Sequence, residues 1–148
     1  MEAGGARHDS VLNSLALQWE SDLLDCVLPF WQKYSVDRVN GGYWTCIDGD
    51  GSIYCNDKFM WLNGRQVYML SRMYCEGGAS TTLLSKSKIT KERRRAWLES
   101  ARVGASFLDK AKCGDGNQLF FSVDETGERK LHFQRKVSIK KKRPFLFR

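Results

Sequence analysis

The stretch that decides the fold lies at residues 57–75 and reads DKFMWLNGRQVYMLSRMYC. Its apolar residues fall on every side of the helix that the stretch predicts, instead of forming one stripe. A helix that is apolar all round is normally buried all round. Asp57 can cap the start of this helix, and Gly77 with Gly78 can end it. We therefore expect a fully buried helix over residues 57–75.

Arg65 lies in the middle of this helix, directly after Gly64. A glycine inside a helix costs about 1 kcal/mol relative to alanine, and the close approach of a backbone or a ligand is its usual reason. Helical spacing places Trp61 and Arg65 on one face, with Lys58 along the same side. An aromatic ring beside a guanidinium suits a sugar or an anion. A buried arginine paired with a carboxylate explains the pattern equally well.

A helix and a small hairpin precede this stretch. Residues 9–35 carry apolar residues at helical spacing, and Pro29 should end or kink their helix. Residues 43–54 contain two β-prone segments around the turn sequence Asp-Gly-Asp-Gly, which predicts a short hairpin. We expect residues 1–8 to form a disordered N-terminus.

A loop, a third helix and a second hairpin follow. Residues 77–90 are small and polar, which predicts a flexible loop. Residues 91–112 predict a helix with an apolar face and a strongly charged outer face. Residues 119–123 and 130–133 predict two strands joined by a turn. The whole pattern predicts an all-α protein with short β-hairpins.

The net charge of +7 comes from the end of the chain. Of the 24 basic residues, seven lie within residues 135–148, which contain no acidic residue, so residues 1–134 hold 17 basic and 17 acidic residues. A solvated, unstructured end is the favoured interpretation of this basic segment. Nucleic-acid binding ranks low because the rest of the chain is neutral. No apolar stretch approaches the length of a membrane span.

The cysteines and histidines offer no metal site. The five cysteines show no CxxC spacing and stand at positions 26, 46, 55, 75 and 113. The polar opening MEAGGARHDS has no signal peptide, so free thiols in the cytoplasm are expected. The sequence DGDGS at residues 48–52 fails as a calcium loop, because Ile53 stands where glycine is needed and Phe59 where the bidentate glutamate belongs. It predicts a plain turn instead.

Five longer motifs are spread over the chain: LPFW at residues 28–31, GGYWTC at 41–46, WLNGRQ at 61–66, FFSV at 120–123 and QRK at 134–136. Together they resemble the N-acylglucosamine 2-epimerase family, in particular its animal members. The resemblance covers about residues 15–76 and 91–136. After residue 136 the chain departs from the family pattern, and residues 77–90 resemble an insertion.

The resemblance implies an (α/α)6 toroid, in which twelve helices form two rings and the active site lies at the mouth of the inner ring. Residues 9–136 would then form the N-terminal part of the toroid, with about three of its twelve helices. The helix at residues 57–75 would be the first inner helix. Residues 137–148 would form a divergent basic tail.

The family interconverts N-acetylglucosamine and N-acetylmannosamine by removing the C2 proton of the opened sugar and returning it on the other face. This chemistry needs a base on each side of C2 and positive charge near the developing enolate oxygen. By resemblance, Arg65 is the active-site arginine, and Trp61 and Lys58 join it in binding substrate. The family's bases are histidines on later helices, assisted by a glutamate, and neither His8 nor His132 matches them.

Two functions stay open at this point. The first is an isomerase of the epimerase type whose full-length form acts on amino sugars, while this chain lacks the bases and is inactive. The second is a non-catalytic partial chain, or a gene-model fragment, that binds a partner protein through apolar faces left uncovered on residues 57–75. The resemblance implies no required cofactor, a nucleotide as a candidate effector and a homodimer as the candidate full-length assembly.

Overall fold

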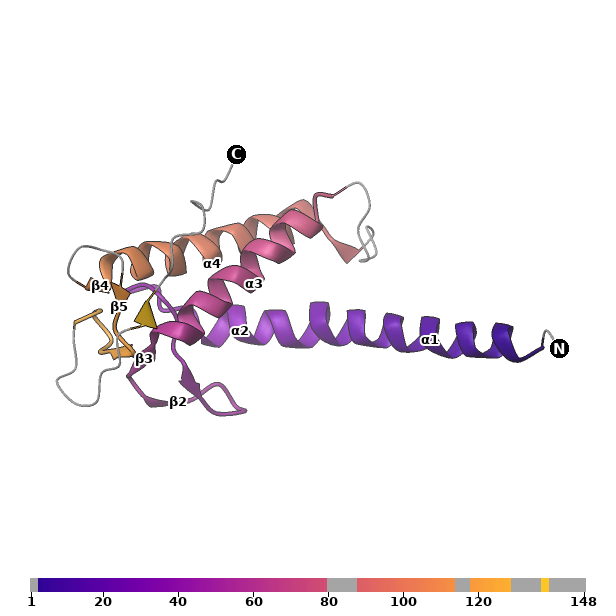
Figure 1. The fold of residues 1–148 in the computed structure, drawn as a ribbon, viewed down its shortest axis with the longest axis horizontal. Coiled ribbons are helices and arrows are strands. Elements are labelled where there is room, and N and C mark those ends of the chain that lie inside the picture. Colours follow the sequence, from indigo (N-terminus) through magenta and orange to yellow (C-terminus); the bar gives the residue numbers. More distant parts are fainter. Residues whose placement is uncertain (1–2, 80–87, 114–117, 129–136, 139–148) are drawn as a thin grey trace.

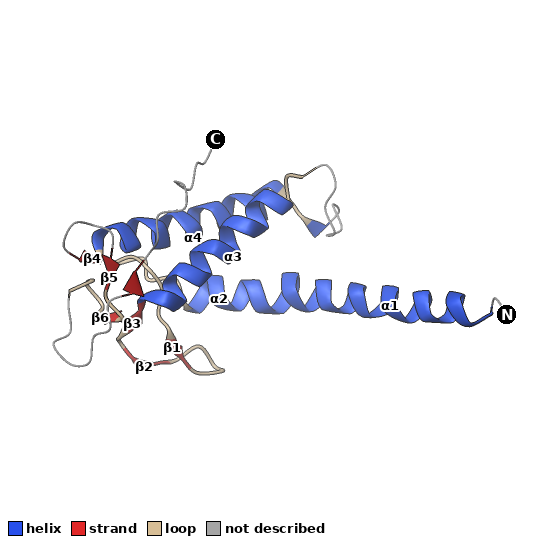
Figure 2. Ribbon diagram, in the orientation of Figure 1, coloured by secondary structure: helices blue, strands red, loops and turns tan. Residues whose placement is uncertain are grey.

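A computed structural model describes residues 3–79, 88–113, 118–128 and 137–138. The helical segments are α1 (Ala3–Ser21), the π-helical η1 (Asp22–Val27), α2 (Leu28–Tyr34), α3 (Met60–Glu76) and α4 (Lys91–Lys110). The strands are β1 (Cys46–Ile47), β2 (Ile53–Cys55), β3 (Lys58–Phe59), β4 (Lys112–Cys113), β5 (Gln118–Leu119), β6 (Ser122–Val123) and β7 (Val137–Ser138). The expected helical class with short antiparallel strand pairs is confirmed, and the strands gather at one end of the helices (Figures 1 and 2).

The first three helical segments form one rod, and α1 projects beyond the other elements (Figure 1). The rod begins at Ala3, within the residues for which a disordered N-terminus is predicted. Extending a formed helix adds one hydrogen bond for each residue fixed, which favours these extra turns. Pro29 does not end the helix, because it lies in the first turn of α2 and follows a π-helical turn. There the Leu28 N–H donates to the carbonyl of Leu23, five residues earlier.

Helices α3 and α4 pack side by side in antiparallel directions (Figure 1). Gly77 ends α3, as predicted, and the side chain of Thr90 caps α4 by accepting from the Arg93 N–H. Near the C-terminal end of the predicted loop at residues 77–90, Ile89 packs on the core. Residues 80–87 of this loop lie outside the described part. The main core lies between this helix pair and η1–α2 and consists of Leu24, Leu28, Val36, Tyr43, Leu70, Met73, Trp97 and Ala101.

The strands form three small antiparallel sheets. The first predicted hairpin is confirmed as β1–β2. The first strand predicted for the second hairpin is divided into β5 and β6, of which β6 pairs with β3 and β5 pairs with β4 and β7. Its second strand, predicted at residues 130–133, lies outside the described part. The β3–β6 pair also explains why α3 starts at Met60, three residues after the predicted cap at Asp57. Of the predicted basic tail, Val137–Ser138 forms β7 and residues 139–148 are not described.

Helix α3 is not buried all round in this chain. Its core side presents Leu70 and Met73, which are 2% and 5% exposed. Its other side presents Trp61 and Tyr68, each 48% exposed, because η1–α2 and α4 cover only part of its circumference. This open side carries Trp61 and Arg65, two of the three residues expected to bind substrate. In the described part of the chain, the helices are too short or too polar to cross a membrane.

Candidate active site

A groove of about 270 Å³ lies between the η1–α2 rod and α3. Trp31, Trp44 and Met69 contribute to its largely apolar lining. Arg65 is the one charged side chain among the described residues that line it. Apolar clefts that contain a few polar groups are the usual form of small-molecule sites. The groove is therefore the candidate active site of this part of the protein.

Trp61 and Arg65 lie together on the open face of α3, as helical spacing predicts. The guanidinium carbon of Arg65 lies 5.8 Å from the centre of the Trp61 ring, within the range of a cation–π contact. Arg65 is exposed, and no carboxylate of a described residue forms an ion pair with it. The alternative of a buried structural ion pair is thus not realised in the described part of the chain.

Asn63 and Gln66 fix the rotation of α3 about its axis. The Tyr43 N–H donates to Asn63 Oδ1 over 2.8 Å, and Asn63 Nδ2 donates to the Tyr43 carbonyl over 3.2 Å. Gln66 Nε2 donates to Ser35 Oγ. Because Asn63 is fully buried on the side of Tyr43, the side that carries Arg65 must face outward. Asn63 and Gln66 belong to the WLNGRQ motif, but their role in fixing the rotation of α3 was not predicted from the sequence.

Tyr43 also ties the site to α4. Its hydroxyl donates to the Ser100 carbonyl over 2.7 Å, and burial raises the pKa of the phenol far above its ordinary value. Gly104 makes room for the ring, since a Cβ at that position would lie 2.4 Å from the ring atoms. The absence of a side chain at Gly104 therefore allows α4 to hold Tyr43, which in turn holds α3.

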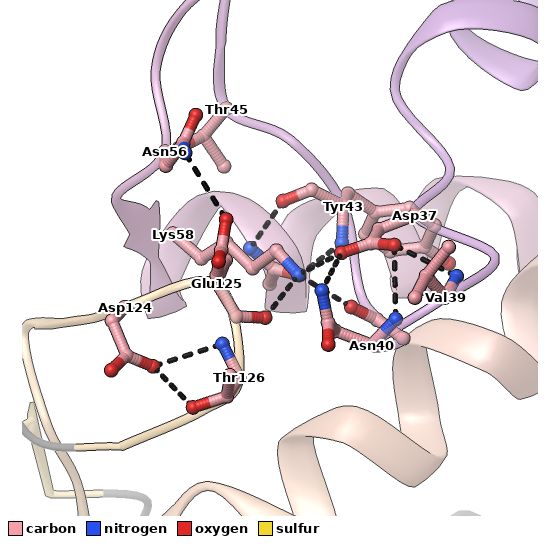
Figure 3. Close-up of polar contacts among 12 residues, drawn as sticks. Asp37, Val39, Asn40, Tyr43, Thr45, Asn56, Lys58, Asp124, Glu125 and Thr126 are labelled. Carbon is pink, nitrogen blue, oxygen red and sulfur yellow. Dashed lines mark hydrogen bonds and ion pairs between the residues drawn. The ribbon is translucent and has the colours of Figure 1, made fainter.

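Lys58 occupies a different place from Trp61 and Arg65. Its side chain is fully buried at the start of β3. Figure 3 shows its ammonium pointing toward Asp37 and Glu125. The ammonium donates to Asp37 Oδ2 over 2.6 Å, and to the carbonyls of Gly41 and Glu125 over 2.8 Å each. All three ammonium protons therefore have acceptors inside the protein.

The expectation that Lys58 shares the face of Arg65 is not met. The helix begins after Lys58, so helical spacing does not apply to that residue. In the described structure Lys58 does not line the groove, and its contacts are those of a structural ion pair. It joins three segments, namely the loop after α2, β3 and the turn at residues 124–128.

The electrostatics of this pair follow from its burial. Burial alone would raise the pKa of Asp37, but hydrogen bonds from Lys58 and from the N–H groups of Asn40 and Val39 hold that pKa below its ordinary value. Burial lowers the pKa of Lys58, and Asp37 opposes this effect. Both shifts are compatible with a charged pair at neutral pH.

Trp44 connects the buried pair to the groove. Its ring centre lies 4.4 Å from Lys58 Nζ, and the residue also lines the groove beside Arg65. The neighbouring Thr45 donates to the Asp57 carbonyl and accepts from the Phe59 N–H. Lys58 thus packs against Trp44, which forms part of the groove lining, without lining the groove itself. No role was predicted for Trp44 or Thr45, although both lie in a motif that the sequence singled out.

Three other candidates from the sequence are the Asp48–Ser52 turn, a metal site and the two histidines. The Asp48–Ser52 segment is a plain turn, because Asp48 accepts from the Gly49 N–H and Asp50 from the Ser52 N–H. Within the described ranges there is no cluster of three side chains able to bind a metal ion. The structure describes neither the side chain of His8 nor His132.

Comparisons with known proteins identify relatives of part of the chain. No family model matches it. It is 38% identical over 85 residues to the N-acylglucosamine 2-epimerase of Mus musculus, and 34% identical to that of Homo sapiens. The match covers 57% of this chain and 17% of each relative, so the chain spans about a sixth of their length.

The fold has a known counterpart as well. The structure matches the cellobiose 2-epimerase of Spirochaeta thermophila with a TM-score of 0.62 at 22% identity, over 80% of this chain and 26% of that one. That neighbour is an (α/α)6 toroid, and the helices described here match a part of it. The sequence matches are thus to N-acylglucosamine 2-epimerases over 57% of this chain, and the fold matches part of a 2-epimerase structure.

Proposed function

We propose that this chain forms one wall of the sugar site of a 2-epimerase, and that the complete protein interconverts N-acetylglucosamine and N-acetylmannosamine. The observation that carries the proposal is the exposed guanidinium of Arg65 beside Trp61 at an apolar groove. The epimerase relatives supply the type of reaction. The family resemblance further suggests a cytoplasmic homodimer with a nucleotide effector and no required cofactor.

The proposed chemistry assigns each group a separate task. Loss of the C2 proton from the opened sugar places negative charge on the C1 oxygen, and Arg65 donates hydrogen bonds to that oxygen. The ring of Trp61 packs against the CH groups of the sugar. Gly64 leaves open space beside them, since a Cβ there would meet no described atom within 4 Å. A sugar or another segment of the protein can approach the helix at this point.

The proton transfers require bases beyond the described lining of this groove. Among its described lining residues there is no histidine and no carboxylate. Epimerisation needs a base on each face of C2. We therefore expect the chain of 148 residues to lack activity on its own. Measurable exchange of the C2 proton of N-acetylmannosamine with deuterated water, catalysed by purified chain, would overturn this expectation.

The role of Arg65 is tested in a full-length form. Arg65→Ala should lower turnover about 10²–10³-fold, as is typical when a donor to a developing oxyanion is removed. The matched control is Arg72→Ala on the same helix, since Arg72 pairs with Glu76 and does not line the groove. Turnover is measured as C2 deuterium incorporation into N-acetylmannosamine. If Arg65→Ala matched the control, Arg65 would have no catalytic role.

A second candidate function, the binding of a partner protein without catalysis, has its own observation. The projecting helix α1 exposes large apolar side chains, with Val11 59%, Leu17 61% and Trp19 66% exposed. Exposed apolar groups of this size often mark interaction surfaces. Replacing Leu17 and Trp19 with glutamine should abolish self-association or partner binding measured by analytical ultracentrifugation. A parent chain that sediments as a monomer with and without a candidate partner would contradict this function.

A further inference from the structure

The β1–β2 hairpin places two cysteines opposite each other. Cys46 and Cys55 are Cα partners in the antiparallel ladder, next to a register irregularity between Cys46 and Ile47. Residues paired in this way project to the same face of the sheet, with Cα atoms about 4.5–5.5 Å apart. Disulfides form between residues whose Cα atoms lie about 4.4–6.8 Å apart. The backbone therefore already holds this pair at a bonding separation.

Both thiols are free in the structure, and they differ in access. Cys46 is buried and Cys55 is half-buried. Burial raises the pKa of the Cys46 thiol, and the charge of the neighbouring Cys55 adds to the rise. The pair thus combines one shielded thiol with one that a small molecule can reach. Reactive cysteine pairs commonly join an accessible attacking thiol to a resolving partner.

We propose that Cys46 and Cys55 form a dithiol redox site that a low-molecular-mass disulfide, such as oxidised glutathione, converts into an intramolecular disulfide. The Cys55 thiolate attacks one sulfur of the oxidant, which forms a mixed disulfide and releases one thiol. The Cys46 thiolate then attacks Cys55 Sγ, which breaks the mixed disulfide and releases the second thiol. The oxidant takes up two electrons, and the protons of the two cysteines end on the two released thiols.

The site adjoins the groove that contains Arg65. Thr45 lines the groove directly before Cys46 and holds the Phe59 N–H through its hydroxyl. A disulfide between Cys46 and Cys55 would crosslink the β1–β2 hairpin, which begins directly after the groove residue Thr45. The redox site itself does not depend on the proposed epimerase activity, so its test requires no turnover.

The test uses the full chain with Cys26, Cys75 and Cys113 replaced by serine, which leaves only the ladder pair. Treatment with oxidised glutathione should remove both free thiols without adding mass from glutathione, and peptide mapping should identify a Cys46–Cys55 bond. The additional change Cys46→Ser should leave a stable glutathione adduct on Cys55, because no resolving thiol remains. Two outcomes would overturn the proposal: both thiols staying free, or a product that consists only of mixed disulfides and intermolecular dimers.

A matched control tests whether proximity in the ladder matters. The variant Cys46→Ser with Cys55→Ser and Cys113→Ser retains the exposed Cys26 and Cys75. It should collect glutathione adducts and form no internal disulfide under the same conditions. The ladder pair should react at least tenfold more slowly in denaturing urea, where the hairpin register is lost. An equal rate in folded and unfolded protein would show that the fold does not create the site.

Discussion

The substitution Lys58→Met tests whether the buried ion pair holds the three segments together. Methionine keeps most of the volume and removes the ammonium. The change deletes the bonds to Asp37 and to the carbonyls of Gly41 and Glu125. It leaves the Asp37 carboxylate, whose side chain is 2% exposed, without a counter-charge.

The expected cost follows from that burial. Removing one partner of a buried pair costs about 3–5 kcal/mol, because the remaining charge is left uncompensated. Since the Lys58 and Asp37 side chains are 0% and 2% exposed, solvent screening does not reduce this figure. The matched control is Arg72→Met, which breaks an exposed pair with Glu76 on α3. Exposed helical pairs of this kind contribute only about 0.3–0.5 kcal/mol.

The assay is urea unfolding at neutral pH, followed by tryptophan fluorescence and analysed by linear extrapolation. Adding Asp37→Asn to Lys58→Met should recover part of the loss. The amide keeps an oxygen for the Val39 and Asn40 N–H groups while removing the stranded charge. The reasoning is refuted if Lys58→Met costs no more than the Arg72→Met control, or if Asp37→Asn fails to restore any stability.

Two further predictions concern the same framework. The pKa of Asp37 is lower in the folded than in the unfolded chain, so its contribution to stability should be complete above the unfolded value of 3.8 and lost as the pH falls through the folded value. Asp37→Asn should therefore reduce the fall in the urea midpoint on acidification. If the pH profile of the midpoint were unchanged in this variant, Asp37 would not be the source of that fall. Gly104→Ala should destabilise by about 1–3 kcal/mol because its Cβ would clash with Tyr43, whereas Gly64→Ala should stabilise by about 0.5–1 kcal/mol because its surroundings are open. Thermal unfolding that ranks the two alanine variants in the opposite order would contradict this.

Local patterns in the sequence were sufficient to predict α4, the centre of α3 and the first hairpin. Each depends on residues close together in the chain, such as the Asp-Gly-Asp-Gly turn and the glycines after α3. The face shared by Trp61 and Arg65 was predictable for the same reason. The epimerase resemblance supplied the larger fold, which periodicity alone could not provide.

The remaining features depend on contacts between distant residues. The β3–β6 pair joins Lys58 to Val123, and no local pattern encodes that pairing. A buried lysine is rare, so exposure was the natural expectation for Lys58. Its partner Asp37 lies in the loop after a different helix, so residue spacing along the chain cannot predict the ion pair. The contribution of Trp44 to the groove was not predicted, because it depends on the contact between Trp44 and Lys58.

The π-helical segment η1 has a consequence for how the chain tolerates changes in length. A π turn holds one residue more than an α turn, and each helical residue rotates the following side chains by about 100°. Deleting one residue within Asp22–Val27 would return this segment to α geometry and leave the faces of α1 and α2 nearly in their present phase. The same deletion inside α1 would rotate every side chain before it relative to the core. We expect homologous sequences to absorb single-residue insertions and deletions at η1 more readily than elsewhere in the rod.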